Sequence, residues 1–177
     1  MEFKKKLPIG IENFSKLQSE DFYYVDKTML IKDLLNNWAE VNLFTRPRRF
    51  GKTLNMSMLE CFFSNRYAGR GDLFEGLSVW EDEAYRQIQG TYPVIFLSFA
   101  DVKADNIQDA RFQVKVKISE LFDQNTYLLD SNVLSDNEKD IFKNITMYMD
   151  DALCCSAVNI MCRYMQRYYN KKVIVLL

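Results

Sequence analysis

Two short runs of consecutive apolar residues constrain the fold of this chain more than any other feature. One lies within residues 93–99, Pro-Val-Ile-Phe-Leu-Ser-Phe, and the other within residues 171–177, Lys-Lys-Val-Ile-Val-Leu-Leu. Uninterrupted apolar strands are typical of parallel sheets that are buried on both faces, because a strand with one wet face alternates apolar and polar residues. Segments with helical spacing lie before and between the two runs. The sequence therefore predicts an α/β fold with parallel strands and flanking helices.

Helical periodicity accounts for most of the remaining chain. Apolar residues recur at spacings of three and four, which predicts amphipathic helices. The residues from Ser135 to Glu138 form a capping-box signature, and either Asp26 or Thr28 is expected to cap the first long helix. The predicted helices cover residues 27–38, 52–63, 81–89, 107–122, 135–149 and 152–169.

The number of strands bears on how the chain is organised. A third strand is predicted at residues 41–45, and residues 21–26 read as a short extended piece. Three strands are fewer than open α/β sheets usually contain, and the last of them runs to Leu177. We therefore expect residues 1–177 to be the N-terminal part of a single domain that is incomplete at its C-terminus, or that borrows strands from a partner.

Composition excludes several classes of function. The 177 residues include no histidine, which removes Ser-His-Asp and Cys-His nucleophiles, His general bases and His-ligated zinc. Lys and Arg number 23 against 24 Asp and Glu, so the net charge of −1 argues against a globally basic nucleic-acid binder. No segment approaches about 18 uninterrupted apolar residues, so we expect no membrane contact and a cytoplasmic location. The cysteines form no CxxC pair and read as reduced thiols; they are Cys61, Cys154, Cys155 and Cys162.

The most specific local motif is Gly51-Lys52-Thr53, which follows the predicted strand at residues 41–45 and opens a predicted helix. A phosphate-binding loop needs a glycine at such a junction, a lysine that reaches the phosphates, and a hydroxyl that coordinates Mg²⁺. The full pattern begins with a glycine where this chain has Arg46, so the strict pattern fails. The alternative is an ordinary helix entry, with Gly51 as a turn residue and Lys52 solvated.

Positive charge is concentrated beside this motif. Arg46, Arg48, Arg49 and Lys52 lie within seven residues. Such a cluster would raise the affinity of a neighbouring anion site for polyphosphate. The alternative is contact with a nucleic-acid backbone, which we rank lower because only Phe50 supplies an interleaved aromatic.

Nucleotide hydrolysis also requires a carboxylate at the end of a neighbouring strand, where it holds Mg²⁺ and organises water. Asp101 follows the predicted strand at residues 93–99 and is a candidate metal ligand. The alternative is a loop or helix-capping aspartate. The strand that ends at Leu177 is followed by no acidic residue in this sequence.

Several blocks of sequence together resemble the AAA-ATPase-like family of bacteria and archaea. They are residues 8–14, 23–28, 45–54, 73–77 and 92–99. The block at 45–54 resembles the variant phosphate loop of that family, in which Arg-Pro-Arg-Arg before Phe-Gly-Lys is usual. Members of the family often carry a C-terminal PD-(D/E)XK-type nuclease domain.

The resemblance implies a P-loop NTPase-like parallel sheet that binds ATP with Mg²⁺. Lys52 would contact the phosphates and Thr53 the metal. The resemblance also implies an acidic motif, the Walker B acid, just beyond the last strand; since this sequence stops before it, we expect weak hydrolysis or none from this chain alone. The implied cofactor-binding residues are Arg48, Arg49, Phe50, Gly51, Lys52, Thr53 and Leu54.

Three functional hypotheses follow, in order of preference. The first is an ATP-binding module, part of a hydrolase of the ATPase type. The second is a non-enzymatic interaction fragment that pairs through its sheet edges with another chain, either the rest of the domain or a second copy. The third is a nucleic-acid contact through Arg46, Arg48 and Arg49, which predicts steeply salt-dependent binding.

Overall fold

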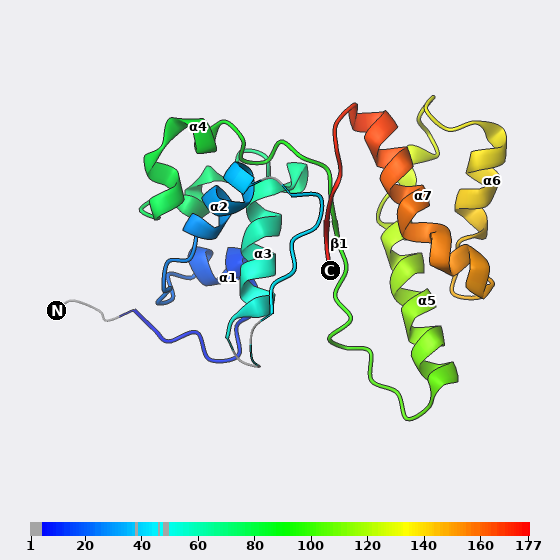
Figure 1. Cartoon of the computed structure of the whole chain (residues 1–177), viewed down its shortest axis with the longest axis horizontal. Helices are drawn as coiled ribbons and strands as arrows, with labels where there is room; N and C mark the ends of the chain where they lie inside the picture. The colour runs from blue at the N-terminus through cyan, green and yellow to red at the C-terminus, as the bar shows by residue number, and fades with distance from the viewer. Residues whose placement is uncertain (1–4, 38, 46, 48–49) are drawn as a thin grey trace. The chain divides into compact units, whose positions relative to one another are not determined.

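Most of the regular structure is helical, as the periodicity of the sequence predicts. The computed structural model describes residues 5–37, 39–45, 47 and 50–177. The chain forms two compact units whose contacts are mostly internal, residues 1–92 (the N-terminal unit) and residues 93–177 (the C-terminal unit). The helices are α1 (Phe14–Ser19), α2 (Met29–Asn37), α3 (Lys52–Phe63), α4 (Glu83–Arg86), α5 (Ile107–Asp123), α6 (Asp136–Asn144) and α7 (Asp151–Tyr169), and the strands are β1 (Val94–Phe96) and β2 (Ile174–Leu176) (Figure 1).

Aromatic side chains form the centre of the N-terminal unit. Phe14 of α1, Phe62 of α3 and Phe74 are fully buried. The Phe74 ring lies 5.2 Å from the Phe14 ring and 5.3 Å from the Phe62 ring, between centroids. The backbone amide of Phe14 donates to the buried hydroxyl of Ser57 at 3.0 Å. These contacts hold α1 against α3, with the second half of α3 as the central element of the unit.

The bounds of α3 agree with the helix predicted at residues 52–63, which is confirmed. Its apolar residues Met58, Leu59 and Phe63 lie within the core. The helix ends where Ser64 adopts an extended backbone, and the next amide, that of Asn65, donates to the carbonyl of Tyr92 at 2.8 Å. The buried residues of α3 lie in its C-terminal half, from Ser57 to Phe63, so burial fixes that half of the helix.

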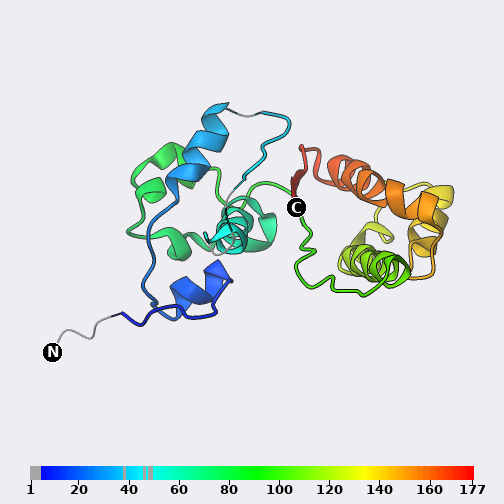
Figure 2. The same ribbon diagram turned by 60° about the horizontal axis from the view of Figure 1, so that its bottom comes forward.

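The C-terminal unit contains the sheet. β1 and β2 pair in parallel, with Val94 opposite Ile174 and Phe96 opposite Leu176. The predicted parallel orientation is confirmed, although each strand is three residues long, shorter than the apolar runs that predicted them. Helices α5, α6 and α7 lie together in both views (Figures 1 and 2) and bury Ile95, Phe122 and Met161 in a common core.

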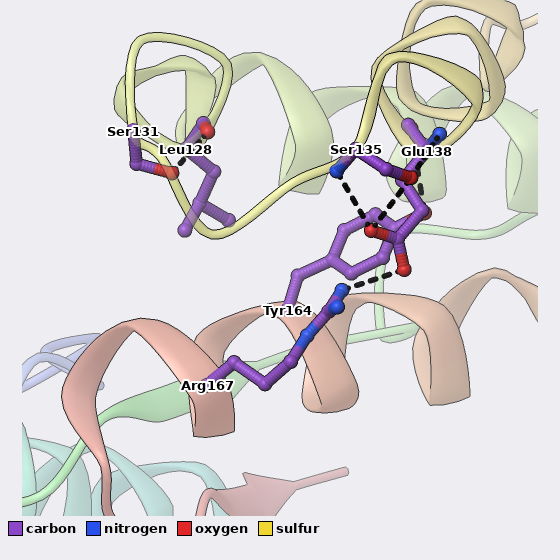
Figure 3. A network of polar contacts seen from close by, with 6 residues as sticks. All are labelled: Leu128, Ser131, Ser135, Glu138, Tyr164 and Arg167. Carbon is purple, nitrogen blue, oxygen red and sulfur yellow. Dashed lines mark hydrogen bonds and ion pairs between the residues drawn. The ribbon is translucent and has the colours of Figure 1, made fainter.

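A polar network joins α6 to α7 (Figure 3). The Glu138 carboxylate accepts hydrogen bonds from the amide of Ser135 at 3.0 Å and from Arg167 at 2.7 Å. The Ser135 hydroxyl accepts from the amide of Glu138, so the predicted capping box is confirmed. The Arg167 guanidinium also lies 5.4 Å from the centroid of the Tyr164 ring. Side chains of the protein therefore cap the first turn of α6 and link it to α7.

Several predicted elements differ from the structure. The helix predicted at residues 135–149 ends at Asn144, because Ile145 leaves helical geometry and is buried in the core. The helix predicted at residues 81–89 is reduced to α4, which follows a 3-10 turn at Ser78–Glu81. The helix predicted at residues 27–38 begins at Met29, and Trp38 lies outside the described residues. The helices predicted at 107–122 and 152–169 agree with α5 and α7 to within one residue.

The strand predicted at residues 41–45 is wrong, because these residues are assigned to no strand. A strand satisfies its backbone amides and carbonyls through a neighbour. Among the described residues, β1 and β2 form the one sheet, and an isolated bridge joins Ser64 and Tyr92. Val41 and Leu43 are accordingly 84% exposed. The fold is therefore α/β but mostly helical, with a small parallel sheet of two strands, and the assignment of residues 1–177 to one domain stays a prediction.

Candidate functional site

The first turn of α3 is the part of the structure on which the sequence-predicted phosphate loop falls. Gly51 is the N-cap residue of α3 and adopts the left-handed conformation, with φ of 73° and ψ of 26°. A residue with a Cβ is strained there, which accounts for the glycine. No side chain caps this helix end. The first i→i−4 hydrogen bond of α3 that the structure describes runs from the amide of Asn55 to the carbonyl of Gly51, at 2.9 Å.

The first amides of a helix have no carbonyl partner within the helix, and they point outward along the helix axis. Together with the helix dipole, they attract anions. The first turn of α3 contains no acidic residue, and its first residue is Lys52. This end of α3 is therefore positive, with no neutralising carboxylate in its own turn.

The predicted site residues that the structure describes follow one another at this end. Phe50 is 59% exposed, Lys52 is exposed, and Thr53 and Leu54 are half-buried. Arg46, Arg48 and Arg49 lie outside the described residues. The charge cluster, and the nucleic-acid hypothesis that depends on it, therefore stay predictions.

A second lysine, which the sequence did not single out, lies beside the same glycine. Lys27 Nζ is 3.5 Å from the point that a Cβ on Gly51 would occupy. Lys27 precedes α2 and is separated from Gly51 by more than twenty residues, so motif spacing around Gly51-Lys52-Thr53 could not reveal it. The available signal was the block at residues 23–28, which contains Lys27.

Both neighbours of Lys27 are anchored by hydrogen bonds. The Asp26 carboxylate accepts from the amide of Thr28 at 2.8 Å and from the amide of Ser78 at 2.8 Å. The buried hydroxyl of Thr28 accepts from the amide of Val79 at 3.1 Å. Partial burial acts to raise the pKa of Asp26, but the hydrogen bonds from Ser78 and Thr28 outweigh it and hold that pKa below its usual range. Either Asp26 or Thr28 was predicted to cap the helix at residues 27–38. The Asp26 carboxylate accepts from the amide of Thr28, the residue directly before α2.

Metal binding was predicted at Thr53 and Asp101. The half-buried Thr53 lies in the first turn of α3, and Asp101 is an exposed residue in a turn after β1 in the C-terminal unit. Across the described part of the chain, no group of three or more His, Cys, Asp or Glu side chains could hold a metal, and the four cysteines are free thiols. Thr53 and Asp101 would supply few protein ligands, which suits an ion that is held mainly by phosphates and water, as Mg²⁺ commonly is. Both assignments stay predictions.

Comparison with known proteins identifies the family to which the chain belongs. Residues 8–177 match the model of the family described as predicted AAA-ATPase, and the chain belongs to that family. The resemblance drawn from the sequence blocks is thereby confirmed, while fusion to a nuclease domain stays a prediction.

One relative is a protein of Azotobacter chroococcum mcd 1 described as "Uncharacterized protein in vnfD 5'region". It is 36% identical to this chain over 127 residues, which are 71% of this chain and 22% of the relative. The chain thus spans less than a quarter of that protein. No solved structure matches the chain. Among the described residues, no helix is both long and apolar enough to cross a bilayer.

Proposed function

We propose that this chain binds ATP together with Mg²⁺ at the N-terminal end of α3, as part of a P-loop NTPase-like domain. The observation that carries the proposal is the start of α3 at Gly51, with left-handed backbone and no side-chain cap, followed directly by Lys52 and Thr53. Membership of the predicted AAA-ATPase family supports nucleotide binding at a general level. The start of α3 supports assigning that binding to these residues.

Each residue of the motif has a distinct role in the proposal. The phosphates lie against the amides at the start of α3, and the Lys52 ammonium pairs with them. The Thr53 hydroxyl is a ligand of Mg²⁺, which when bound neutralises charge on the phosphate oxygens. Phe50 and Leu54 flank the anion without supplying charge, and Arg48 and Arg49 are proposed to add positive charge. The base of the nucleotide is not part of the proposal.

The proposal concerns binding rather than turnover. Hydrolysis needs a carboxylate that positions the metal and the attacking water. Asp101 is the candidate for that role within this chain. We also propose that this chain hydrolyses ATP weakly or not at all by itself. Its proposed partner is the rest of the domain or a second copy.

The second candidate function is pairing with another chain, and one observation favours it. Val41 and Leu43 are 84% exposed and Phe44 is 43% exposed, in a segment that forms no strand. An exposed apolar segment of this kind can add to the edge of another sheet. Sedimentation of the purified chain tests pairing with a second copy, since that pairing requires a mass above that of the monomer.

Calorimetric titration of ATP with Mg²⁺ tests the first proposal. Wild-type protein is expected to bind in a saturable way, and Lys52→Ala is expected to weaken binding by about a hundredfold, because a charge-assisted contact to the phosphates is lost. Lys16→Ala is the matched control: Lys16 is an exposed lysine of α1 in the same unit. Equal affinities of the wild type and Lys52→Ala would contradict the site assignment.

A further inference from the structure

We propose that Lys27 is a second phosphate-binding lysine, which pairs with the same polyphosphate as Lys52 from the side of Gly51. This inference rests on the proposed function and extends it to a residue on another segment of the chain. Lys27 lies outside the Gly51-Lys52-Thr53 motif and comes to the site only through the fold of the N-terminal unit.

The position of the ammonium group is the first argument. Lys27 Nζ lies 3.5 Å from the point that a Cβ on Gly51 would occupy, which is ordinary van der Waals distance. It is therefore beside the residue at which α3 begins. An anion bound at the first amides of α3 would lie at this end of the helix, so the ammonium of Lys27 is well placed to pair with it.

The residues on either side of Lys27 are held in place by hydrogen bonds. Asp26 is held by the amide and hydroxyl of Ser78, at 2.8 and 2.7 Å. Thr28 is fully buried, and its hydroxyl donates to Asp26 at 2.7 Å while accepting from the amide of Val79. The backbone on both sides of Lys27 is thus fixed to the 3-10 turn Ser78–Glu81. A lysine that served only solvation would not require an anchored residue on either side of it.

The third argument is charge. Among the described residues, no acidic side chain forms an ion pair with Lys27. Its ammonium instead faces the positive end of α3, close to the residue that precedes Lys52. Like charges at short range repel, so this arrangement is unfavourable by itself. A polyanion bound between the lysines and the helix end converts that repulsion into attraction.

The chemistry of the ligand follows from the number of cations. Two ammonium groups and one helix end suit an anion with several charged groups in a row, such as the phosphate chain of a nucleoside di- or triphosphate. A single phosphate cannot use both lysines as fully. Inorganic tripolyphosphate is therefore a suitable probe, because it has the charges and no base.

Titration of wild type, Lys27→Ala, Lys27→Arg and Lys16→Ala with Mg-ATP and with tripolyphosphate tests the proposal. Lys27→Ala is expected to weaken binding of both ligands by about tenfold, which corresponds to one charge-assisted contact. Lys27→Arg keeps the charge and should retain most of the affinity. Added salt should weaken the wild type more than Lys27→Ala, because screening acts on the charge that the variant lacks.

The outcomes separate the two proposals. If the wild type binds, Lys52→Ala does not, and Lys27→Ala equals Lys16→Ala, then Lys27 is merely solvated and this inference is overturned while the proposed function stands. If the wild type binds neither ligand, the proposed function itself fails. Urea unfolding of Lys27→Ala should match the wild type, since its ammonium forms no ion pair among the described residues; a lower midpoint would overturn the assignment of its effect to the ligand.

A double-mutant cycle tests whether Asp26 positions Lys27. Asp26→Asn removes the charge that accepts from Ser78 and Thr28 while leaving Lys27 in the chain. The single variant should lower affinity for tripolyphosphate by less than Lys27→Ala, and the double variant should lose no more than Lys27→Ala alone. Additive losses would contradict the positioning role of Asp26.

Discussion

The two ends at which α3 and α7 begin are built in opposite ways. At the start of α7, the Asp150 carboxylate accepts from the amide of Leu153 at 2.7 Å, and Asp151 pairs with Lys115 at 2.8 Å. At the start of α3, the N-cap residue is Gly51, no side chain caps the helix and the first turn contains no acid. The first residue of α3 is Lys52, and Lys27 Nζ lies 3.5 Å from the point that a Cβ on Gly51 would occupy.

This difference separates helix ends that are satisfied by their own side chains from one that leaves its first amides without a side-chain cap. Helices α5, α6 and α7 each begin with a side-chain cap and an acidic residue in the first turn, the arrangement that stabilises a helix by itself. α3 forgoes both and adds positive charge. An arrangement that is poor for an isolated helix is suitable for binding an anion.

The largest expected effect comes from giving α3 the acid that α7 has. Gly51→Asp places a carboxylate at the helix end, where it competes for the amides, pairs with Lys27 and repels phosphates. Binding of Mg-ATP should fall by at least about a hundredfold. Titration calorimetry measures the loss, and tryptophan fluorescence checks that the N-terminal unit is folded, since Trp38 and Trp80 both belong to it.

Gly10→Asp is the matched control for backbone strain. Gly10 has the same φ of 73°, and a Cβ there would meet nothing within 4 Å. It should cost similar strain and leave affinity for Mg-ATP unchanged. Equal loss in both variants would mean that strain, and not the uncapped helix end, governs binding.

A smaller effect, on stability alone, is expected from removing the cap of α7. Asp150→Ala deprives the Leu153 amide of its acceptor and should lower the free energy of unfolding by about 1 kcal/mol. Affinity for Mg-ATP should not change. Urea unfolding followed by far-UV circular dichroism measures the free energy of unfolding. A loss of affinity without a loss of stability would contradict the expectation that the start of α7 serves stability and the start of α3 serves binding.

The smallest effect concerns pH. The hydrogen bond from Arg167, followed by that from the Ser135 amide, holds the pKa of Glu138 below its ordinary value of 4.5. A lowered folded-state pKa means that the contribution to stability is complete above the ordinary pKa and is lost as the pH falls through the folded-state pKa. Because the site is partly solvated, this contribution is below about 1 kcal/mol at neutral pH.

Glu138→Gln keeps the shape and lacks the titration. The wild type should therefore be the more stable protein at pH 7, and its advantage should shrink as the pH is lowered through the acidic range. Urea midpoints measured across that range test the expectation. A constant difference at every pH would show that the carboxylate charge of Glu138 is not what Arg167 recognises.

Local signals explain which parts of the fold could be predicted from the sequence. The bounds of α3, α5 and α7 followed from apolar spacing and flanking residues, because burial of one face decides where such helices extend. The capping box at Ser135 followed from four consecutive residues. Strand lengths could not be predicted in this way, because a strand exists only where another strand pairs with it. Residues 41–45 have strand-like composition and no partner among the described residues.

In the candidate site, too, the residues of a local motif could be predicted, and a residue brought in by tertiary contacts could not. Gly51, Lys52 and Thr53 form a contiguous motif, so their placement at one helix end could be predicted. Lys27 was missed as a site residue because its approach to Gly51 depends on contacts between distant segments. No periodicity or spacing near Gly51 encodes that approach.

The hydrogen bonds of Asp26 and Thr28, on either side of Lys27, also have a consequence for the order of folding. Asp26 and Ser78 are 52 positions apart, and Thr28 and Val79 are 51 positions apart. Closing such a long loop is slow relative to forming a helix turn, since its entropy is lost before the contact is gained. A nascent chain would thus contain the complete Gly51-Lys52-Thr53 motif long before Lys27 was in place. If Lys27 pairs with polyphosphate as proposed, its contribution to binding would begin only once residues 78–79 had been synthesised and docked.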